Sequence, residues 1–252
     1  MFPQIDPRWL IHAAIIALTL SVIGLTAGVA WDGYGRYRAT TRLVQANEMA
    51  DRLIAAAGIH AMERGVTSAV LGAVATAGPP FRKQLAELRR SGDHEWRAAI
   101  EIARRLAAGR PDDAAFASAL ARAERSYDVL AAMRLRVDED LIRRAAAVLF
   151  GEWIETITVF IAANARLREL SFRSVELSQD FSQLNLSLRH SLWVISEHAG
   201  LERGTLAYYV GARRPLPPEK LDELKSFRGV VDHSIETLLA LKTWIPDSAR
   251  SR

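Results

Sequence analysis

The stretch ERGVTSAVLGA at residues 63–73 returns as ERGTLAYYVGA at residues 202–212, and this recurrence decides the fold. Around it, residues 63–104 align with residues 202–243 without a gap, at an offset of 139 residues (202 minus 63). The identical pairs are Glu63 and Glu202, Arg64 and Arg203, Gly65 and Gly204, Gly72 and Gly211, Ala73 and Ala212, Pro79 and Pro218, Leu85 and Leu224, Arg89 and Arg228, Asp93 and Asp232, and His94 and His233. A proline stop between two charged motifs, present twice, predicts two copies of one helix–turn–helix unit.

The whole chain has the composition and spacing of long helices. Half of its 252 residues are hydrophobic, and only nine are proline and 15 are glycine. Apolar residues recur at intervals of three and four, and no strand-like alternation of useful length is present. We expect an all-α protein, with a first amphipathic stripe that reaches Val74 and further helices at about 81–108, 112–136, 139–170, 176–212 and 218–244.

The N-terminus predicts a membrane helix. Trp9 to Trp31 is an apolar run of 23 residues, counted inclusively, with His12 as its only ionisable group. A helix of that length covers about 30 Å of hydrocarbon, and tryptophan suits both interfaces. The alternative is a cleaved signal peptide, because Gly28 and Ala30 are small residues of the kind that precede a cleavage site. The length of the run favours an uncut anchor.

These elements give a domain prediction. We expect a short tail at 1–8, a transmembrane helix at 9–31, a first bundle repeat at 32–170 and a second, truncated repeat at 171–252. Each repeat is expected to be an antiparallel four-helix bundle. The second copy stops near Pro246, where its second helix should turn into its third. We therefore expect either that the chain is a fragment or that another segment completes the second bundle.

The repeated arginines fall on the apolar stripes of the first and fifth helices, at Arg64 and Arg203. A buried, unpaired guanidinium is costly, so both arginines require partners. In one interpretation each forms an ion pair within its own copy, Arg64 with Asp93 and Arg203 with Asp232. In the other, the two arginines converge on one small planar anion, which a guanidinium binds through two parallel hydrogen bonds. Both interpretations hold if the aspartates orient the arginines.

Other repeated or stripe residues have simpler explanations. Arg89 and Arg228 lie four residues before the aspartates, and we expect them to be solvated. His60 lies on the first stripe and is interpreted as a satisfied core histidine. Gly72 and Gly211 are single helix glycines, which favours close packing between helices.

Catalytic and metal-binding patterns are absent from the sequence. It has no Glu-x-x-His pair, no His-Glu-x-x-His, no phosphate-binding glycine loop and no nucleophile elbow, so we expect no enzyme, no cofactor and no metal. The chain has no cysteine, which excludes disulfides and thiolate zinc sites. Its net charge is +4, with basic and acidic residues interleaved, so nucleic acid is not an expected partner.

The doubled motif resembles the nitrate- and nitrite-sensing (NIT) domain of bacterial transmembrane receptors. The shared features are Glu-Arg-Gly on a long membrane-proximal helix, a turn, and then Arg-x-x-x-Asp on the next helix. Here these are Glu63-Arg64-Gly65 with Arg89 and Asp93, and again residues 202–204 with Arg228 and Asp232. The resemblance covers about residues 33–244. The family often follows Glu-Arg-Gly with Leu-Ser, a pattern that this chain lacks, which leaves the ligand open.

The resemblance implies two stacked helical bundles in an extracytoplasmic input domain, with nitrate or nitrite as ligand for some members. It implies Arg64 and Arg203 as ligand contacts. We expect a single-pass protein of the bacterial inner membrane with its bulk in the periplasm, acting in signal transduction as a homodimer. Arg36, Arg38 and Arg42 after the apolar run argue for the opposite orientation by the positive-inside rule. The alternative function is a membrane-anchored scaffold without a small ligand.

Overall fold

The computed structural model describes residues 7–73, 78–145, 147–172 and 179–241, and these are helical with no strand among them. The helices are α1 (Pro7–Gly72), α2 (Pro79–Ala108), α3 (Ala114–Arg143), α4 (Phe150–Ser171), α5 (Gln179–Gly211) and α6 (Pro218–Leu241). The prediction of an all-α fold is confirmed. Residues 1–6 of the predicted tail, Val74, Pro246 and the expected end of the last helix at Trp244 lie outside the described residues.

The chain forms two compact units, residues 1–44 and residues 45–252. In the first unit, apolar side chains of α1 are exposed all along its length, including Leu18, Leu25 and Val29. Among the described residues, α1 is the one helix long and apolar enough to cross a membrane, judged by length and composition. The side chains described at residues 16–38 are all exposed, as a lipid-facing or cleaved segment requires.

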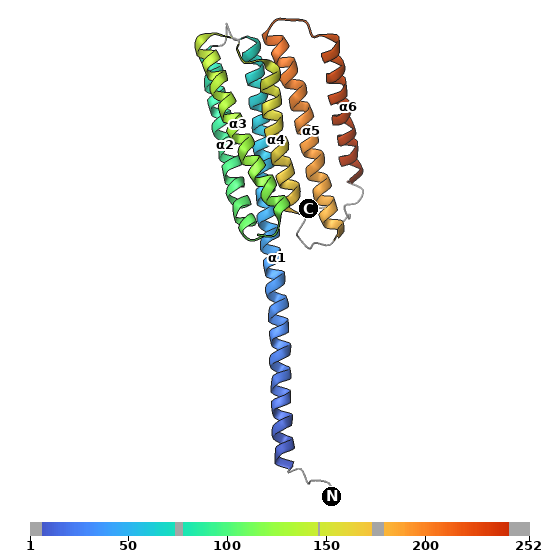
Figure 1. Cartoon of the computed structure of the whole chain (residues 1–252). Helices are drawn as coiled ribbons and strands as arrows, with labels where there is room; N and C mark the ends of the chain where they lie inside the picture. The colour runs from blue at the N-terminus through green and yellow to red at the C-terminus, as the bar shows by residue number, and fades with distance from the viewer. Residues whose placement is uncertain (1–6, 74–77, 146, 173–178, 242–252) are drawn as a thin grey trace. The chain divides into compact units, whose positions relative to one another are not determined.

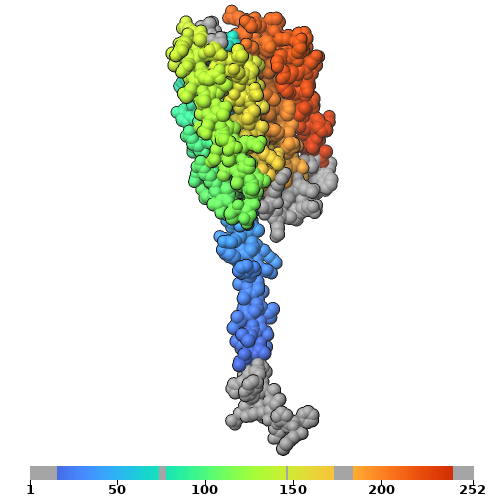
Figure 2. Space-filling model, in the orientation of Figure 1, coloured from blue at the N-terminus to red at the C-terminus, as the bar shows by residue number. Residues whose placement is uncertain are grey.

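The second unit is an antiparallel array of helices around the C-terminal part of α1. In Figure 1, α2 and α3 lie on one side, α5 and α6 lie on the other, and α4 stands between α3 and α5. The face turned to the viewer in Figure 2 consists of α3 and α4 (green and yellow) beside α5 and α6 (orange and red). Both copies of the repeat therefore belong to the same compact unit.

Local sequence signals set most helix ends. Gly78 and two prolines begin α2, and Gly109 caps its end just before a proline. The Asp113 carboxylate begins α3 by accepting a hydrogen bond from Phe116 N at 2.9 Å. The predicted boundary between the third and fourth helices, at 136–139, is wrong. The helix continues to Arg143 and ends in a left-handed cap at Arg144 (φ 51°), because its apolar face continues through Val137 and Leu141, both buried.

The core of the first copy is built from aromatic rings on three helices. Trp96 and Tyr127 stack at 3.9 Å, with Phe160 against both of them. The Trp96 indole donates to Asn164 Oδ1 at 2.9 Å, which satisfies both buried polar groups. Ile157 and Phe160 are almost completely buried, so α4 contributes its apolar side chains to this core.

Helices α1 and α5 pack side by side in parallel, and the repeated glycines Gly72 and Gly211 make close contacts between them. A Cβ added at Gly72 would lie 2.3 Å from the Tyr208 carbonyl oxygen, and one at Gly211 would lie 2.4 Å from that of Ala69. Tyr208 and Gly211 are the positions 139 residues beyond Ala69 and Gly72, so the two contacts are related by a local two-fold axis. The interpretation of both glycines as close-packing residues is confirmed.

This contact predicts that two glycine-to-alanine substitutions change the free energy of unfolding in opposite directions. Gly211→Ala should lower the free energy of unfolding by about 1–3 kcal/mol, because the rigid Ala69 backbone must move to admit the methyl group. Gly229→Ala is the matched control: it meets nothing within 4 Å and should stabilise α6 by about 0.5–1 kcal/mol. Thermal and urea unfolding of the full chain, followed by circular dichroism, measure both. Equal effects from the two substitutions would contradict the close contact.

Candidate functional site

Glu63 is the centre of a buried ion network within the first copy. Arg134 from α3 donates from Nε to Glu63 Oε1 at 2.8 Å and from Nη2 to Oε2 at 2.6 Å. Arg89 from α2 donates to Oε1 at 3.1 Å, and His60 Nδ1 lies 3.2 Å from Oε2. The network continues from Arg134 to Asp93 at 2.9 Å. The glutamate of the motif therefore connects α1, α2 and α3.

The electrostatics of this network favour the charged forms. Burial by itself would raise the pKa of Glu63, but hydrogen bonds from His60 and Arg134 and the charge of Arg134 hold it at about 2. Burial would lower the pKa of Arg134, but hydrogen bonds and charge from Glu63, together with the charge of Asp93, raise it. Burial and the Asp93 carboxylate raise the pKa of Tyr127, whose hydroxyl donates to Asp93 at 2.8 Å.

Arg64 points the other way, towards the second copy. Its guanidinium is completely buried and donates to both carboxylate oxygens of Glu197 on α5, at 2.6 and 3.2 Å. It also donates to the Glu197 carbonyl oxygen at 3.0 Å and to the Thr158 hydroxyl on α4 at 3.1 Å. Arg64 is thus paired, as expected, but the predicted pair with Asp93 is wrong. The helix turns that side chain towards α5, whereas Asp93 lies within the first bundle.

Arg203 differs sharply from its counterpart. It is exposed, and among the described residues its guanidinium has no hydrogen bond or ion pair. Its side chain lies across Gly65, with Nε 3.6 Å from the position of a Cβ there, and Arg64 lies in the same way against Gly204, at 3.6 Å. The predicted pair between Arg203 and Asp232 is wrong, because Asp232 lies beside Arg228 on its own helix. The predicted core position of Arg203 is also wrong, because the residue is exposed.

A pocket of about 330 Å³ opens beside Arg203. Met62, Gly65, Val66 and Ala69 of α1, Phe81, Gln84 and Leu88 of α2, and Arg203 and Ala207 of α5 line it. Arg203 is the only charged group among these lining residues, and most of the others are apolar. The pocket therefore offers an anion one unpaired guanidinium beside a largely apolar wall.

The remaining predicted residues lie elsewhere. Asp93 binds Arg134 and Tyr127. Asp232 is exposed and lies 3.4 Å from Arg228 Nε on its own helix. Arg89 was expected to be solvated, but it is largely buried and donates to Glu63 and Asp138. Its equivalent Arg228 is exposed as expected. His60 is fully buried against Phe160, as predicted for a core histidine, although its Nε2 has no partner.

Sequence reasoning missed Glu197 and Arg134. Glu197 has no counterpart in the first copy, where the same position is Gly58, so the repeat gave no signal for it. Arg134 did leave a signal, because it falls between Leu130, Met133 and Val137 on the buried face of its helix. An arginine in that register requires a buried acid, and Glu63 on the repeated motif is the nearest candidate.

Fold and site together define an all-helical domain in which two copies of a helical unit meet through buried charges beside an open pocket with one cationic side chain. The family model for nitrate and nitrite sensing (NIT) matches residues 59–246, and the chain belongs to this family. It therefore carries a sensory input domain of the kind found in signalling receptors. Comparisons with curated proteins and with solved structures give no match.

The depressed pKa of Glu63 predicts that the stability of the fold decreases in acid over a defined range of pH. The carboxylate stabilises the fold above its unfolded-state pKa of about 4.5, and this stabilisation is lost as the pH falls from there towards 2. Glu63→Gln should cost roughly 3–5 kcal/mol at neutral pH, since it leaves Arg134 without its main partner. The difference in unfolding free energy between wild type and variant should narrow over that window in urea titrations at stepped pH.

Glu236→Gln provides the control for this series, because Glu236 is exposed on α6 and has no ion pair within the described parts of the chain. It should leave the pH profile unchanged. If the unfolding free energy of Glu63→Gln changed in parallel with that of the wild type from pH 5 to 2, the Glu63 network would not be the cause of the loss of stability in acid.

Proposed function

We propose that this chain is the extracytoplasmic input region of a bacterial transmembrane signalling protein and that it detects a small anion, nitrate or nitrite. The family assignment supports the sensory role. The exposed apolar side chains of α1 support a membrane anchor. The location proposed for the chain is the inner membrane, with its bulk in the periplasm. This function requires no catalytic residue, cofactor or metal.

The observation that carries the proposal is the unpaired Arg203 guanidinium over Gly65. Because Gly65 has no side chain, the guanidinium can lie against α1 at the mouth of the pocket. A planar anion with a single charge fits such a group through two parallel hydrogen bonds. The apolar walls contributed by Val66, Phe81 and Leu88 favour weakly hydrated nitrate over strongly hydrated anions.

Arg64 is the second ligand contact in this proposal. In the structure it is occupied by Glu197, so an anion can reach it only if the Glu197 carboxylate moves away. That exchange would replace an interhelical ion pair by a bound ligand and would change how α5 packs on α1. Binding would then favour a different arrangement of the two helices, which is the requirement for a ligand to act as a signal.

An alternative proposal is a membrane-anchored scaffold that binds a protein or a second copy of itself and no small ligand. One observation favours it: large apolar side chains of α5 and α6 are exposed, among them Leu192, Val210 and Leu239. Such a face suits another helical surface. A homodimer is compatible with both functions, since receptors and scaffolds alike can pair through it.

The proposal predicts nitrate binding that depends on Arg203. Isothermal titration of the full chain in a neutral detergent should show binding of nitrate or nitrite by the wild type. Arg203→Ala should weaken it by at least about tenfold, the loss expected for one charge-assisted hydrogen-bonded contact of 1.5–3 kcal/mol. Chloride at equal ionic strength serves as the reference anion.

Arg213→Ala is the matched control, because Arg213 is an exposed arginine near the end of the same helix that does not line the pocket. It should bind as the wild type does. Glu197→Gln tests the second contact: a neutral side chain competes less well for Arg64, so this variant should bind nitrate more tightly. Wild-type affinity in Arg203→Ala would refute the site, and no binding by the wild type would favour the scaffold.

A further inference from the structure

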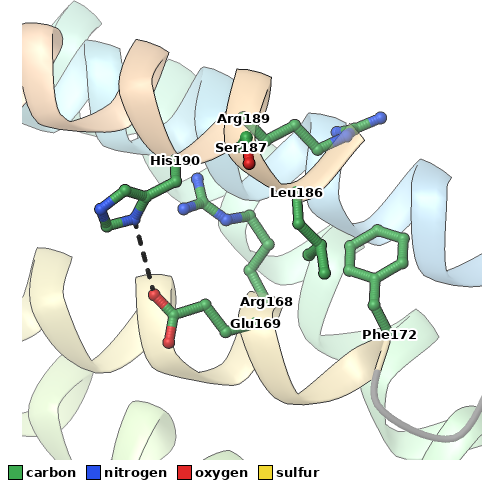
Figure 3. A pocket seen from close by; sticks show the side chains of 7 residues that line it. All are labelled: Arg168, Glu169, Phe172, Leu186, Ser187, Arg189 and His190. Carbon is green, nitrogen blue, oxygen red and sulfur yellow. Dashed lines mark ion pairs between the residues drawn. The ribbon is translucent and has the colours of Figure 1, made fainter. Parts of the chain in front are cut away.

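A second cavity of about 330 Å³ lies between the end of α4 and the start of α5, away from the pocket at Arg203. Arg168, Glu169 and Phe172 line it from α4 and the residue after it, and Leu186, Ser187, Arg189 and His190 line it from α5. Figure 3 shows the Arg168 side chain rising from α4 into the space between His190 and Leu186, whereas Arg189 extends away from it. The cavity thus has one cationic side chain directed into it.

Arg168 is buried without an acceptor. The residue is only 3 % exposed, and its guanidinium has no hydrogen bond or ion pair among the described residues. Burial lowers its pKa to about 10, so the group still carries its charge at neutral pH. Buried arginines are normally paired, because an unpaired charge in the interior is costly. Arg64 and Arg134 in the same unit follow that rule, with Glu197 and Glu63 as their partners.

The neighbouring carboxylates are already engaged. Glu169 lies 3.2 Å from Arg166 through Oε2 and 3.9 Å from His190 Nδ1 through Oε1, as the dashed line in Figure 3 shows. Arg189 is paired with Asp51 on α1. Around the cavity, three arginines (Arg166, Arg168 and Arg189) are therefore present for two carboxylates (Glu169 and Asp51). The local excess of positive charge is the complement of an anion.

We propose that this cavity binds a small oxyanion of the phosphate class, with the Arg168 guanidinium as its principal contact. Ser187 supplies a hydroxyl and His190 an imidazole on the α5 side, so donors from two helices face the same space. A tetrahedral oxyanion has enough acceptor oxygens for all three. The bound anion would connect α4, the last helix of the first copy, to α5, the first helix of the second copy. This proposal is independent of the nitrate site.

The test titrates inorganic phosphate into the full chain in a neutral detergent, at constant ionic strength set with chloride, by calorimetry and by thermal shift. Wild type should bind phosphate and gain thermal stability. Arg168→Met keeps the length of the side chain without its charge and should weaken binding by at least tenfold. Arg203→Ala should leave phosphate binding unchanged, while Arg168→Met should leave nitrate binding unchanged, which separates the two sites.

A second pair of variants covers the case in which Arg168→Met fails to fold. Ser187 and Ser196 are both exposed on α5, and only Ser187 lines the cavity. Ser187→Glu places a negative charge in the cavity and should abolish phosphate binding, whereas Ser196→Glu should not affect it. Folded Arg168→Met with wild-type phosphate affinity, equal binding by the two glutamate variants, or no phosphate binding by the wild type would each overturn the proposal.

A further arm identifies the source of the oxyanion. Short-chain phosphatidic acid presents the same phosphate group on a lipid, and short-chain phosphatidylcholine masks it. Displacement of inorganic phosphate by phosphatidic acid alone assigns the cavity to a lipid headgroup. Displacement by neither lipid, with phosphate binding retained, assigns it to a soluble phosphate. Both outcomes support an oxyanion site at Arg168.

Discussion

The ion pair between Arg64 and Glu197 is the interaction on which the sensory unit depends. It is buried, it joins the two copies of the repeat, and it fixes which way the motif arginine faces. With the glutamate of the motif committed to the first bundle, the arginine is free to face α5, and the glycine admits the partner arginine. Three adjacent residues on one turn of α1 thus serve three different contacts. Each of these contacts in the first copy needs its own residue type.

The two copies have the same motif but different chemistry around it. Glu63 is held by Arg134, Arg89 and His60, whereas none of these partners surrounds Glu202 among the described residues. Both terminal nitrogens of Arg64 donate hydrogen bonds to Glu197 or Thr158, whereas Arg203 is exposed to solvent. This asymmetry makes one arginine structural in the observed arrangement and leaves the other available. In the proposed function, the buried pair would hold the two helices together while the exposed guanidinium remains open to a ligand.

Much of the fold follows from the sequence, because it depends on local signals. Proline and glycine stops placed most helix ends, and the repeat predicted the close-packed glycines at 72 and 211. The partners of the charged residues could not be predicted in the same way. The apolar stripe of α1 indicates that Arg64 is buried. Other helices surround α1 on several sides, however, so only the packing of these helices determines that Arg64 faces Glu197 instead of Asp93. The repeat predicted that Arg203 is as deeply buried as Arg64. That prediction failed because Arg203 lies at an open pocket.

The reciprocal glycine contact also has a mechanical consequence. Where Gly72 and Gly211 bring the two backbones together, no side chain is available to deform, so a movement of α5 on α1 would occur most easily as a tilt about that point. Gly65, beside Arg203, lies about 10 Å along the helix from this fulcrum, and Asn47, which accepts a hydrogen bond from Asn185, lies about 38 Å from it, at 1.5 Å per residue. The helix pair is then a lever: a displacement of 1 Å at the arginine would become one of about 4 Å at its far end.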